Sequence, residues 1–259
     1  MSKIHIRGGK ADNPTVIMLT QHLTGLGHEV DRSGLKPFDV VVSWGLSYRG
    51  DRPSLNGNVN QFDKYDCFEE FRKAHVLCPS TLSLIEGHNL CDFAGPISVP
   101  LQLPWLARKR RHAKGKDIVV CKDSKDVGRV LFQDRHDFFS VFIPTETEFR
   151  VWLFQDKAFA IQEKVYKGPG EYAGFLRNNR FGFRFEKRDN LRGYAHVLED
   201  QSIKAVKALG LDFGAVDVLL GKDRNYYVLE TNTMPAIDSI KRSSGIRLAK
   251  HISKWAENQ

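Results

Sequence analysis

The sequence has few cysteines, and the four that it has are not paired by spacing. Cys67, Cys78, Cys91 and Cys121 form no CxxC motif, and no histidine lies at the spacing of a zinc finger. We therefore expect four free thiols, which are typical of proteins in a reducing compartment.

Long apolar runs are also missing. No stretch reaches the roughly eighteen consecutive apolar residues that a membrane-spanning helix requires. The first ten residues, MSKIHIRGGK, do not contain the apolar segment of a signal peptide. We therefore expect no membrane partner and a cytoplasmic location.

Motifs for covalent catalysis are absent as well, since no GxSxG segment and no Cys–His signature occur. Acidic residues are in the minority: 39 Lys and Arg stand against 31 Asp and Glu, which gives a net charge of +8. A basic protein favours anionic partners, and nucleotides, acidic peptides and nucleic acids all qualify.

The most informative segment contains two apolar runs, Gly214–Leu220 and Tyr226–Asn232, on either side of a turn-rich GKDRN. This pattern predicts a β-hairpin. Three side chains with oxygen atoms, Asp217, Glu230 and Asn232, interrupt the apolar runs. Glu230 and Asn232 are two residues apart, so they share one face of their strand.

The register of this hairpin decides what those side chains can do. We expect the loop to be Lys222–Asn225, so that Gly221 pairs with Tyr226. In that register Asp217 lies opposite Glu230 at roughly 5 Å, whereas a slip of one residue would separate them. Two carboxylates so close repel, and a hard divalent cation would remove the conflict. The alternative is a hairpin with a satisfied polar pair near its end.

A basic segment, LPWLARKRRHAKGKDIVV, predicts a strand over Trp105–Lys109, a loop over Arg110–Lys116 and a strand over Asp117–Cys121. A loop rich in Gly and Lys between two strands is suited to closing over polyphosphate. Five of the seven residues in Arg108–Lys114 are Lys or Arg, which also suits a nucleic-acid patch. The residues alone leave both interpretations open.

The first part of the chain predicts a small α/β lobe. A strand over Lys3–Arg7, a helix over Pro14–Leu26 and a buried strand over Phe38–Trp44 follow one another in β-α-β order. The pair Gly8 and Gly9 after the first strand is interpreted as a turn rather than a phosphate-binding loop.

Further strands are predicted over Phe138–Ile143, Phe149–Phe154 and Ala158–Val165, the last two as a second hairpin. Arg150 and Lys164 interrupt this hairpin. Single cations in strands usually reach solvent, unless an anion binds there.

The segment Gly168–Asn190 is rich in Gly, Arg, Asn and aromatic residues, which predicts a functional loop or a loop plus a strand. Arg177, Asn178 and Arg184 suit a carboxylate or a phosphate, and the phenylalanines of the segment suit nucleic acid instead. Helices are predicted over Gln61–His75, Ala195–Leu209 and Ile246–Ala256.

From about residue 60 to the end, these segments resemble the ATP-grasp superfamily and, more narrowly, the RimK-like carboxylate–amine ligases. The strongest match is LDFGAVDVLLGKDRNYYVLETNTMPAI, which resembles the closing motif of that family. By this resemblance Asp217, Glu230 and Asn232 would be the ligands of one or two Mg²⁺ ions, with Mn²⁺ as the alternative ion.

Three more segments extend the resemblance. LARKRRHAKGKDIVV resembles the nucleotide-binding strand and lid loop, and Arg108 stands where the family usually has a phosphate-binding lysine. FFSVFIPTETEFRVWLFQDKAFAIQEKV resembles the segment from the adenine hinge to the strand with a catalytic arginine, and LRNNRFGFRF resembles a substrate-binding segment. The implied roles are ATP binding by Arg108, His112, Gly115, Lys116, Phe142 and Ile143, catalysis by Arg150 and Lys164, and substrate binding by Arg177 and Asn178.

The resemblance implies an α/β (α+β) ATP-grasp fold with an amino-terminal α/β lobe over residues 1–82, a lid lobe over 83–143 and a carboxy-terminal lobe over 144–259. ATP would lie between the last two lobes. The implied reaction is phosphorylation of a substrate carboxylate by Mg·ATP, followed by attack of an amine on the acylphosphate. An amino acid or a peptide would suit as substrate, and a homo-oligomer is typical of such ligases. The alternatives are a binding protein for nucleic acid or an acidic partner on a degenerate ATP-grasp fold, and a phosphotransferase on the same fold.

Overall fold

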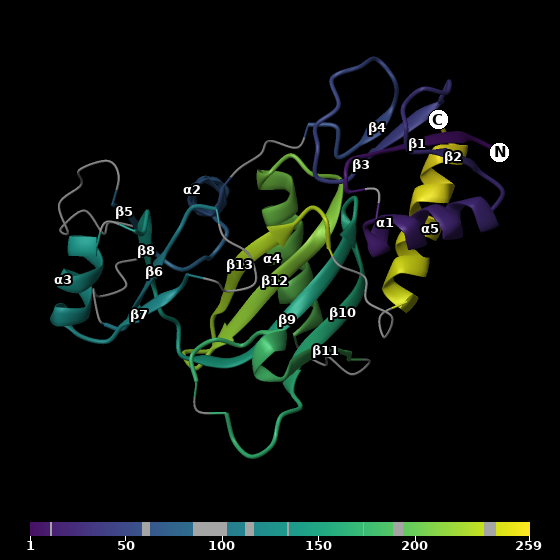
Figure 1. Ribbon diagram of the computed structural model, residues 1–259. Helices are drawn as coiled ribbons and strands as arrows, with labels where there is room; N and C mark the ends of the chain where they lie inside the picture. The colour runs from purple at the N-terminus through teal and green to yellow at the C-terminus, as the bar shows by residue number, and fades with distance from the viewer. Residues whose placement is uncertain are drawn as a thin grey trace.

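The strands of the chain form three sheets (Figure 1). The central sheet lies between a lobe that holds the chain's first strands and a lobe that holds helix α3. The computed structural model describes residues 1–10, 12–58, 63–84, 103–111, 117–133, 135–172, 174–188, 194–235 and 242–259.

The first sheet is parallel, in the order β2-β1-β3-β4. Helix α1 connects β1 to β2, and the side chain of Asn13 caps its first turn. The predicted β-α-β order is confirmed, although β4 falls where the sequence predicts only a loop. The elements are β1 (Lys3–Arg7), α1 (Pro14–Gly25), β2 (Glu29–Asp31), β3 (Val40–Ser43) and β4 (Ser54–Leu55).

The central sheet is antiparallel, in the order β11-β10-β9-β12-β13. Both predicted hairpins are present in it as β9–β10 and β12–β13. The 3₁₀-helix η1 (Asn179–Phe181) precedes β11. The strands are β9 (Thr145–Phe154), β10 (Lys157–Tyr166), β11 (Phe183–Lys187), β12 (Phe213–Gly221) and β13 (Tyr226–Asn232).

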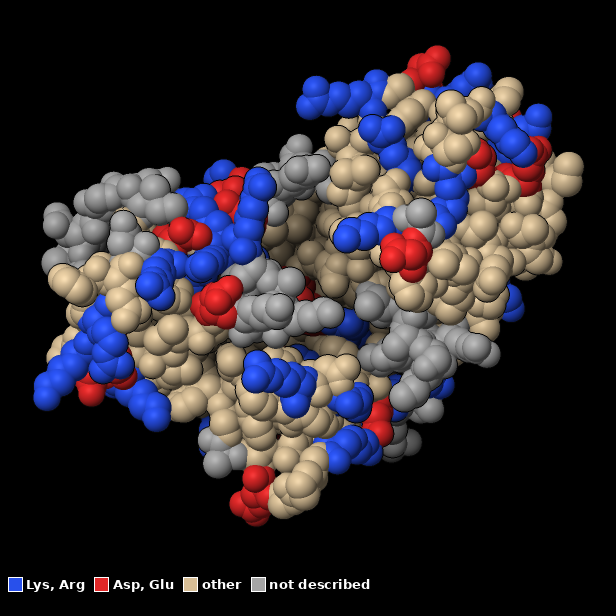
Figure 2. Space-filling view, viewed as in Figure 1, with Lys and Arg blue, Asp and Glu red and all other residues tan. Residues whose placement is uncertain are grey.

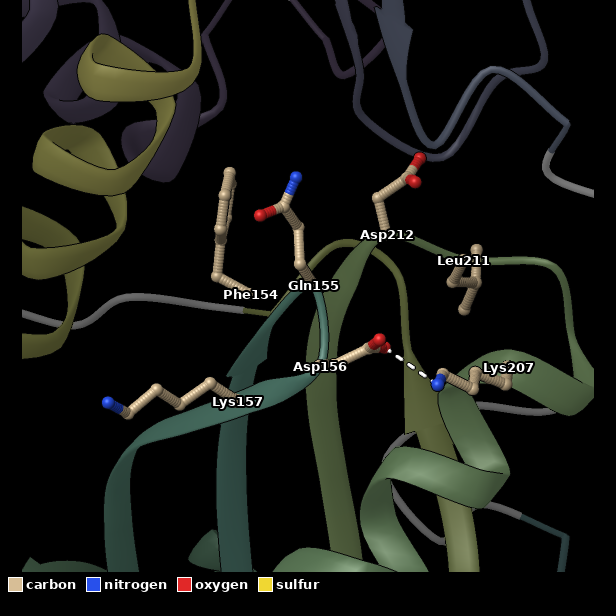
Figure 3. Close-up of a pocket in the computed structure, with 7 residues that line it drawn as sticks. All are labelled: Phe154, Gln155, Asp156, Lys157, Lys207, Leu211 and Asp212. Atoms are coloured by element: carbon tan, nitrogen blue, oxygen red, sulfur yellow. Dashed lines mark ion pairs between the residues drawn. The ribbon is translucent and has the colours of Figure 1, made fainter.

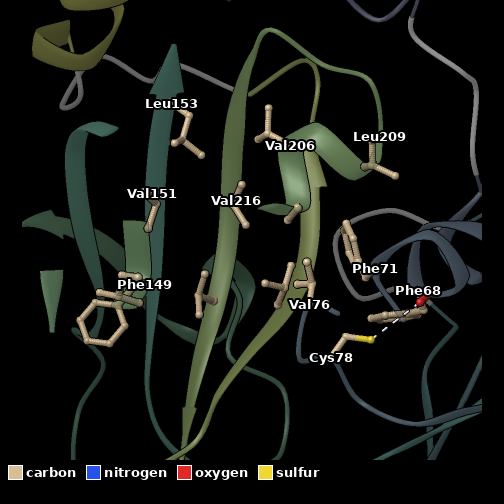
Figure 4. Close-up of a cluster of buried hydrophobic side chains, with 14 of the residues drawn as sticks. Phe68, Phe71, Val76, Cys78, Phe149, Val151, Leu153, Val206, Leu209 and Val216 are labelled. Carbon is tan, nitrogen blue, oxygen red and sulfur yellow. Dashed lines mark hydrogen bonds between the residues drawn. The ribbon is translucent and has the colours of Figure 1, made fainter. Parts of the chain in front are cut away.

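One face of the central sheet is covered by α2 (Lys64–Lys73) and α4 (Ala195–Ala208). Phe149, Val151 and Leu153 alternate along β9 and pack with Val216 of β12 beneath these helices (Figure 4). Because side chains alternate between the two faces of a strand, the residues between these positions point to the opposite face. The aromatic side chains Phe68 and Phe71 of α2 belong to this core and are buried.

The third sheet has the order β5-β8-β6-β7 and packs against α3. Helix α3 lies between β7 and β8, in a stretch for which no element is predicted from the sequence. Arg108 ends β6, one residue earlier than predicted. The elements are β5 (Thr81–Ser83), β6 (Trp105–Arg108), β7 (Val119–Cys121), α3 (Ser124–Gln133) and β8 (Phe138–Val141).

The final helix, α5 (Arg242–Glu257), packs against α1 and joins the core of the first lobe to the central sheet (Figure 1). Its His251 ring lies 5.2 Å from the Phe154 ring and 5.1 Å from the Phe159 ring. The carboxy-terminal helix is therefore held on the central sheet by an aromatic cluster.

The cysteines inside the described part of the chain are free thiols. Cys67, Cys78 and Cys121 have no disulfide partner, and burial raises the pKa of the Cys67 thiol to about 12. Cys91 lies outside the described residues. Among the helices that the structure describes, none is long and apolar enough to cross a bilayer.

We predict that His251 makes stability dependent on pH. Burial lowers its pKa, and Arg247, Lys157 and Lys254 add to the effect. The unfolded chain, where the pKa is about 6.5, therefore binds a proton more readily than the folded chain. The free energy of unfolding should be highest above about pH 6.5 and should fall as the pH drops towards the lower folded-state pKa.

Urea unfolding at about pH 7.5 and about pH 5.5 measures this difference in stability. His251→Gln should show a smaller loss on acidification than the unaltered chain. His196→Gln, which changes an exposed histidine of α4, is the matched control. The same loss in all three proteins would contradict the prediction.

Candidate active site

The β12–β13 hairpin places Asp217 opposite Glu230, as the sequence predicts. The predicted pairing of Gly221 with Tyr226 is wrong, because Leu220 is the partner of Tyr226. A bulge in β13 restores the expected pairing further along the strands. Its extra residue, Leu229, packs against the core of the third sheet.

The difference begins at the turn, which has three residues rather than four. The N–H of Gly221 donates to the carbonyl of Asn225 at 2.9 Å, so Asn225 belongs to the ladder. Arg224 adopts a positive φ of 67°, which closes the shorter loop.

Arg150 lies on the neighbouring strand β9, opposite Asp217. Its Nε and Nη2 atoms donate to the two carboxylate oxygens of Asp217 at 2.7 and 2.8 Å. The side chains are 13% and 9% exposed, so this bidentate pair is shielded from water. The general expectation that strand cations reach solvent is therefore wrong for Arg150.

Glu230 is paired with Lys64, the first residue of α2. Burial alone would raise the pKa of Glu230, but Lys64, Arg150 and Arg108 together lower it to about 2. Glu230 is therefore a carboxylate at any working pH. No motif in the sequence points to Lys64, and its only local signal is its place directly after Asp63, the N-cap of α2.

A second ion pair lies on the same face of the sheet, between Lys164 of β10 and Glu148 of β9. Burial raises the pKa of Glu148, and Lys164 opposes that shift. The cations of both pairs lie over the Phe185 ring, with Arg150 Cζ at 4.3 Å and Lys164 Nζ at 5.0 Å from its centroid. Lys164 therefore does not reach solvent either. Glu148 was also missed, although it stands two residues before Arg150.

Arg108 comes from the third sheet and approaches the same region. Its Cζ lies 5.7 Å from the ring centroids of Phe68 and Phe138. Burial lowers its pKa to about 10, and the negative charge of Glu230 opposes that shift. Arg108 thus remains a cation at neutral pH and interacts electrostatically with a proposed metal ligand.

The start of the predicted lid loop is fixed to the first turn of α2. Arg110 Nη1 bonds Asp63 at 3.3 Å and Asp66 at 3.0 Å, and its guanidinium lies 4.6 Å from the Tyr65 ring. The carbonyl of Arg110 accepts a hydrogen bond from the N–H of Lys64 at 3.1 Å. The remaining loop residues proposed for ATP, His112, Gly115 and Lys116, lie outside the described residues.

The predicted adenine hinge connects the third sheet to the central sheet. Ile143 is buried in the core of the third sheet, and Phe142 lies edge-on to Phe175 at 4.9 Å. Lys122 lies 5.5 Å above the Phe175 ring. The segment after β10 therefore contacts the hinge.

The structure gives the two proposed substrate residues different surroundings. Arg177 donates to the carbonyls of Thr145 and Glu146 at 3.0 and 3.2 Å, which leaves its positive charge uncompensated by those partners. Asn178 caps η1 by accepting from the N–H of Phe181 at 3.3 Å. Lys and Arg side chains are visible on the lower part of the face shown in Figure 2.

The proposed metal ligands have the chemistry that Mg²⁺ prefers. Asp217 and Glu230 offer carboxylates, and Asn232 offers an amide oxygen on the same face of β13. Asn232 Oδ1 also accepts from the N–H of Met234 at 2.9 Å, and a second lone pair of this oxygen remains for a metal. Among the described residues, no group of three or more His, Cys, Asp and Glu side chains offers an alternative metal site.

Two other features do not belong to this site. A Cβ on Gly8 would lie 2.3 Å from the carbonyl oxygen of Trp44, so close packing against β3 requires this glycine. A hollow of about 550 Å³ lies at the β9–β10 turn, where Asp156 pairs with Lys207 and Asp212 lies nearby (Figure 3). Its lining residues include neither Arg150 nor the proposed metal ligands.

Comparison with known proteins identifies the family. The RimK-like ATP-grasp domain matches residues 62–256. The chain belongs to the RimK-like ATP-grasp family. A relative named a probable alpha-L-glutamate ligase, from Haemophilus influenzae, is 29% identical over 210 residues, which cover 77% of this chain and 64% of the relative.

Solved structures agree on the ATP-grasp fold. The ATP-grasp ligase PsnB, in complex with a minimal precursor, has a TM-score of 0.70 and 15% identity, and the match covers 100% of this chain and 99% of PsnB. D-alanine–D-alanine ligase from Bacillus anthracis has a TM-score of 0.68 and 15% identity over 100% of this chain and 98% of the ligase. At such identities the likeness shows the fold alone.

We predict that the ATP-grasp chain depends strongly on the Arg150–Asp217 pair for stability. Arg150→Met should lower the free energy of unfolding by roughly 3–5 kcal/mol, because it leaves a buried carboxylate without its cation. Adding Asp217→Asn should recover part of the loss by removing that charge. Urea unfolding in EDTA measures both changes.

Lys204→Met is the matched control for this prediction. Its partner Asp200 lies one turn away on α4, and both side chains are about half exposed. Loss of that pair should cost less than about 0.5 kcal/mol. A comparable cost for Arg150→Met would show that the buried pair contributes no more than a surface pair.

Proposed function

We propose that this chain is an ATP-dependent, ADP-forming carboxylate–amine ligase. The observation that carries the proposal is the alignment of Asp217 with Glu230 across β12 and β13, beside Arg150 on β9. Carboxylates and cations thus lie together on the face of the sheet opposite α2 and α4. This arrangement suits the transfer of a phosphoryl group.

Asp217, Glu230 and Asn232 would hold one or two Mg²⁺ ions. Bound there, Mg²⁺ would neutralise charge on the β- and γ-phosphates of ATP. Glu230 is already ionised, since cations hold its pKa low. No proton has to leave this carboxylate before it binds a metal ion.

The nucleotide would lie between the third sheet and the central sheet. Adenine would lie against the hinge at Phe142 and Ile143, and the phosphates would point towards Arg108 and the lid-loop residues His112, Gly115 and Lys116. Arg108 is positioned for this role because it is a partly buried cation that interacts with Glu230. Its charge would stabilise the negative charge that spreads over the transferring phosphoryl group.

The reaction would proceed in two displacements. An oxygen of the substrate carboxylate attacks the γ-phosphorus, and the bond to the bridging oxygen breaks, which releases ADP and leaves an acylphosphate. The amine nitrogen then attacks the carbonyl carbon, loses a proton, and expels inorganic phosphate. Arg150 and Lys164 would stabilise the tetrahedral oxyanion, because both cations lie on the reacting face.

The substrate would be an amino acid or a peptide that supplies the carboxylate or the amine. Arg177 would bind the substrate carboxylate, and Asn178 would orient the η1 turn beside it. Two findings support this class: one relative is named for glutamate ligation, and the PsnB structure contains a precursor. Calorimetric titration with ATP in Mg²⁺ and in EDTA, followed by ADP release with a panel of acids and amines, tests the assignment.

Glu230→Gln should abolish ADP release, because it removes one of the two negative charges that the proposed site offers to a divalent cation. Circular dichroism should show that the fold is retained. Glu186→Gln, which changes an exposed partner of Lys167 on β11, is the control and should keep full activity. Turnover of Glu230→Gln at the rate of the unaltered protein would refute the metal assignment.

Arg108→Met should weaken ATP binding by about tenfold to a hundredfold, since it removes a charged hydrogen-bond donor from the phosphates. Calorimetry in the presence of Mg²⁺ measures the change in dissociation constant. Arg129→Met, which changes an exposed ion pair on α3, serves as control. ATP binding of equal strength in the two variants would place the phosphates elsewhere.

A further inference from the structure

Both proposed carboxylate ligands of the metal site already have cationic partners from this chain. Arg150 occupies both oxygens of Asp217 with two hydrogen bonds of 2.7 and 2.8 Å. Lys64 pairs with Glu230 from the first turn of α2, 166 residues earlier in the sequence. A divalent cation would therefore compete with these partners for the carboxylate charges.

The charges of the four groups sum to zero. A divalent cation that enters alone would bring two positive charges to a site where Lys64 and Arg150 remain. Arg108, which interacts electrostatically with Glu230, would increase the repulsion. Like charges at short range oppose binding, and more strongly where the groups are partly buried than in bulk water.

We propose that Lys64 and Arg150 act as built-in counter-ions that keep free divalent cations out of the site, so that the metal enters only together with a polyphosphate. This inference rests on the proposed function. A polyphosphate would supply negative charges with which the Lys64 and Arg150 side chains can pair, so that the net charge of the site stays close to zero. The carboxylates would thus become available to the metal only when a nucleotide arrives.

Lys64 is the residue through which this role can be tested, because Arg150 is also proposed to act in catalysis. Lys64 is a positioning residue, since it acts through Glu230. Its backbone N–H also bonds the carbonyl of Arg110, the first residue of the predicted lid loop. The first turn of α2 thus contacts both Glu230 and the base of the lid loop.

The experiment measures binding of Mn²⁺ alone to the full chain, without nucleotide, by the loss of the free-ion signal in electron paramagnetic resonance. Lys64→Met should bind Mn²⁺ about tenfold to a hundredfold more tightly than the unaltered chain, because it removes one charged contact from Glu230. Lys64→Arg keeps the charge and should behave like the unaltered chain. Lys73→Met is the matched control. It removes the same charge from the same helix, but Lys73 pairs with Glu70 and not with Glu230.

Three results would overturn the counter-ion role while leaving the ligase proposal intact. They are tight binding of free Mn²⁺ by the unaltered chain, unchanged Mn²⁺ affinity in Lys64→Met, and an equal gain in Lys73→Met. Failure of the unaltered chain to bind ATP with Mg²⁺ in calorimetry would instead overturn the proposed function, and this inference with it. Thermal unfolding in EDTA confirms that each variant is folded before its Mn²⁺ affinity is compared.

Discussion

Asp217 lies on β12, and the pairing of this strand with both of its neighbours positions the candidate site. Arg150 of β9 lies opposite it on one side and Glu230 of β13 on the other. The register is held from the opposite face, where Val216 and Val218 are fully buried beneath α2 and α4. A slip of one residue would turn Asp217 into the hydrophobic core beneath the helices and would turn these valines towards the charged face. The hydrophobic core therefore fixes the position of the charged groups.

The sequence predicted this arrangement through two errors that cancel. The apolar runs and the turn residues were sufficient to place the hairpin, but the turn is one residue shorter than expected. The bulge at Leu229 then shifts the pairing back by one residue, so Asp217 still meets Glu230. Neither Gly nor Pro marks this bulge, and Leu229 packs against a sheet that is remote in sequence. Local sequence rules therefore could not predict it.

Partners that come from distant parts of the chain account for the other differences. Periodicity predicted α2 and its aromatic core residues, because that signal is local. The contact of Lys64 with Glu230 depends on how α2 packs against the sheet, which no local pattern specifies. The family resemblance implied a catalytic role for Arg150, whereas the general rule for cations in strands suggested that its side chain reaches solvent. The rule fails because Asp217 provides the anion that a partly buried guanidinium requires.

The first lobe contacts the central sheet away from the charged side chains of Arg150, Asp217 and Glu230. Asn56 is fully buried, and its side chain bonds the backbone N–H groups of Asp212 and Phe213 and the carbonyl of Phe213, where β12 begins. Gly45 packs closely against Met234, two residues after Asn232. Since these contacts hold both ends of the segment that carries Asp217, Glu230 and Asn232, the docking of the first lobe limits how far the proposed metal ligands can move apart. If these residues are the ligands, the proposed exchange of counter-ions would need no rearrangement of the backbone.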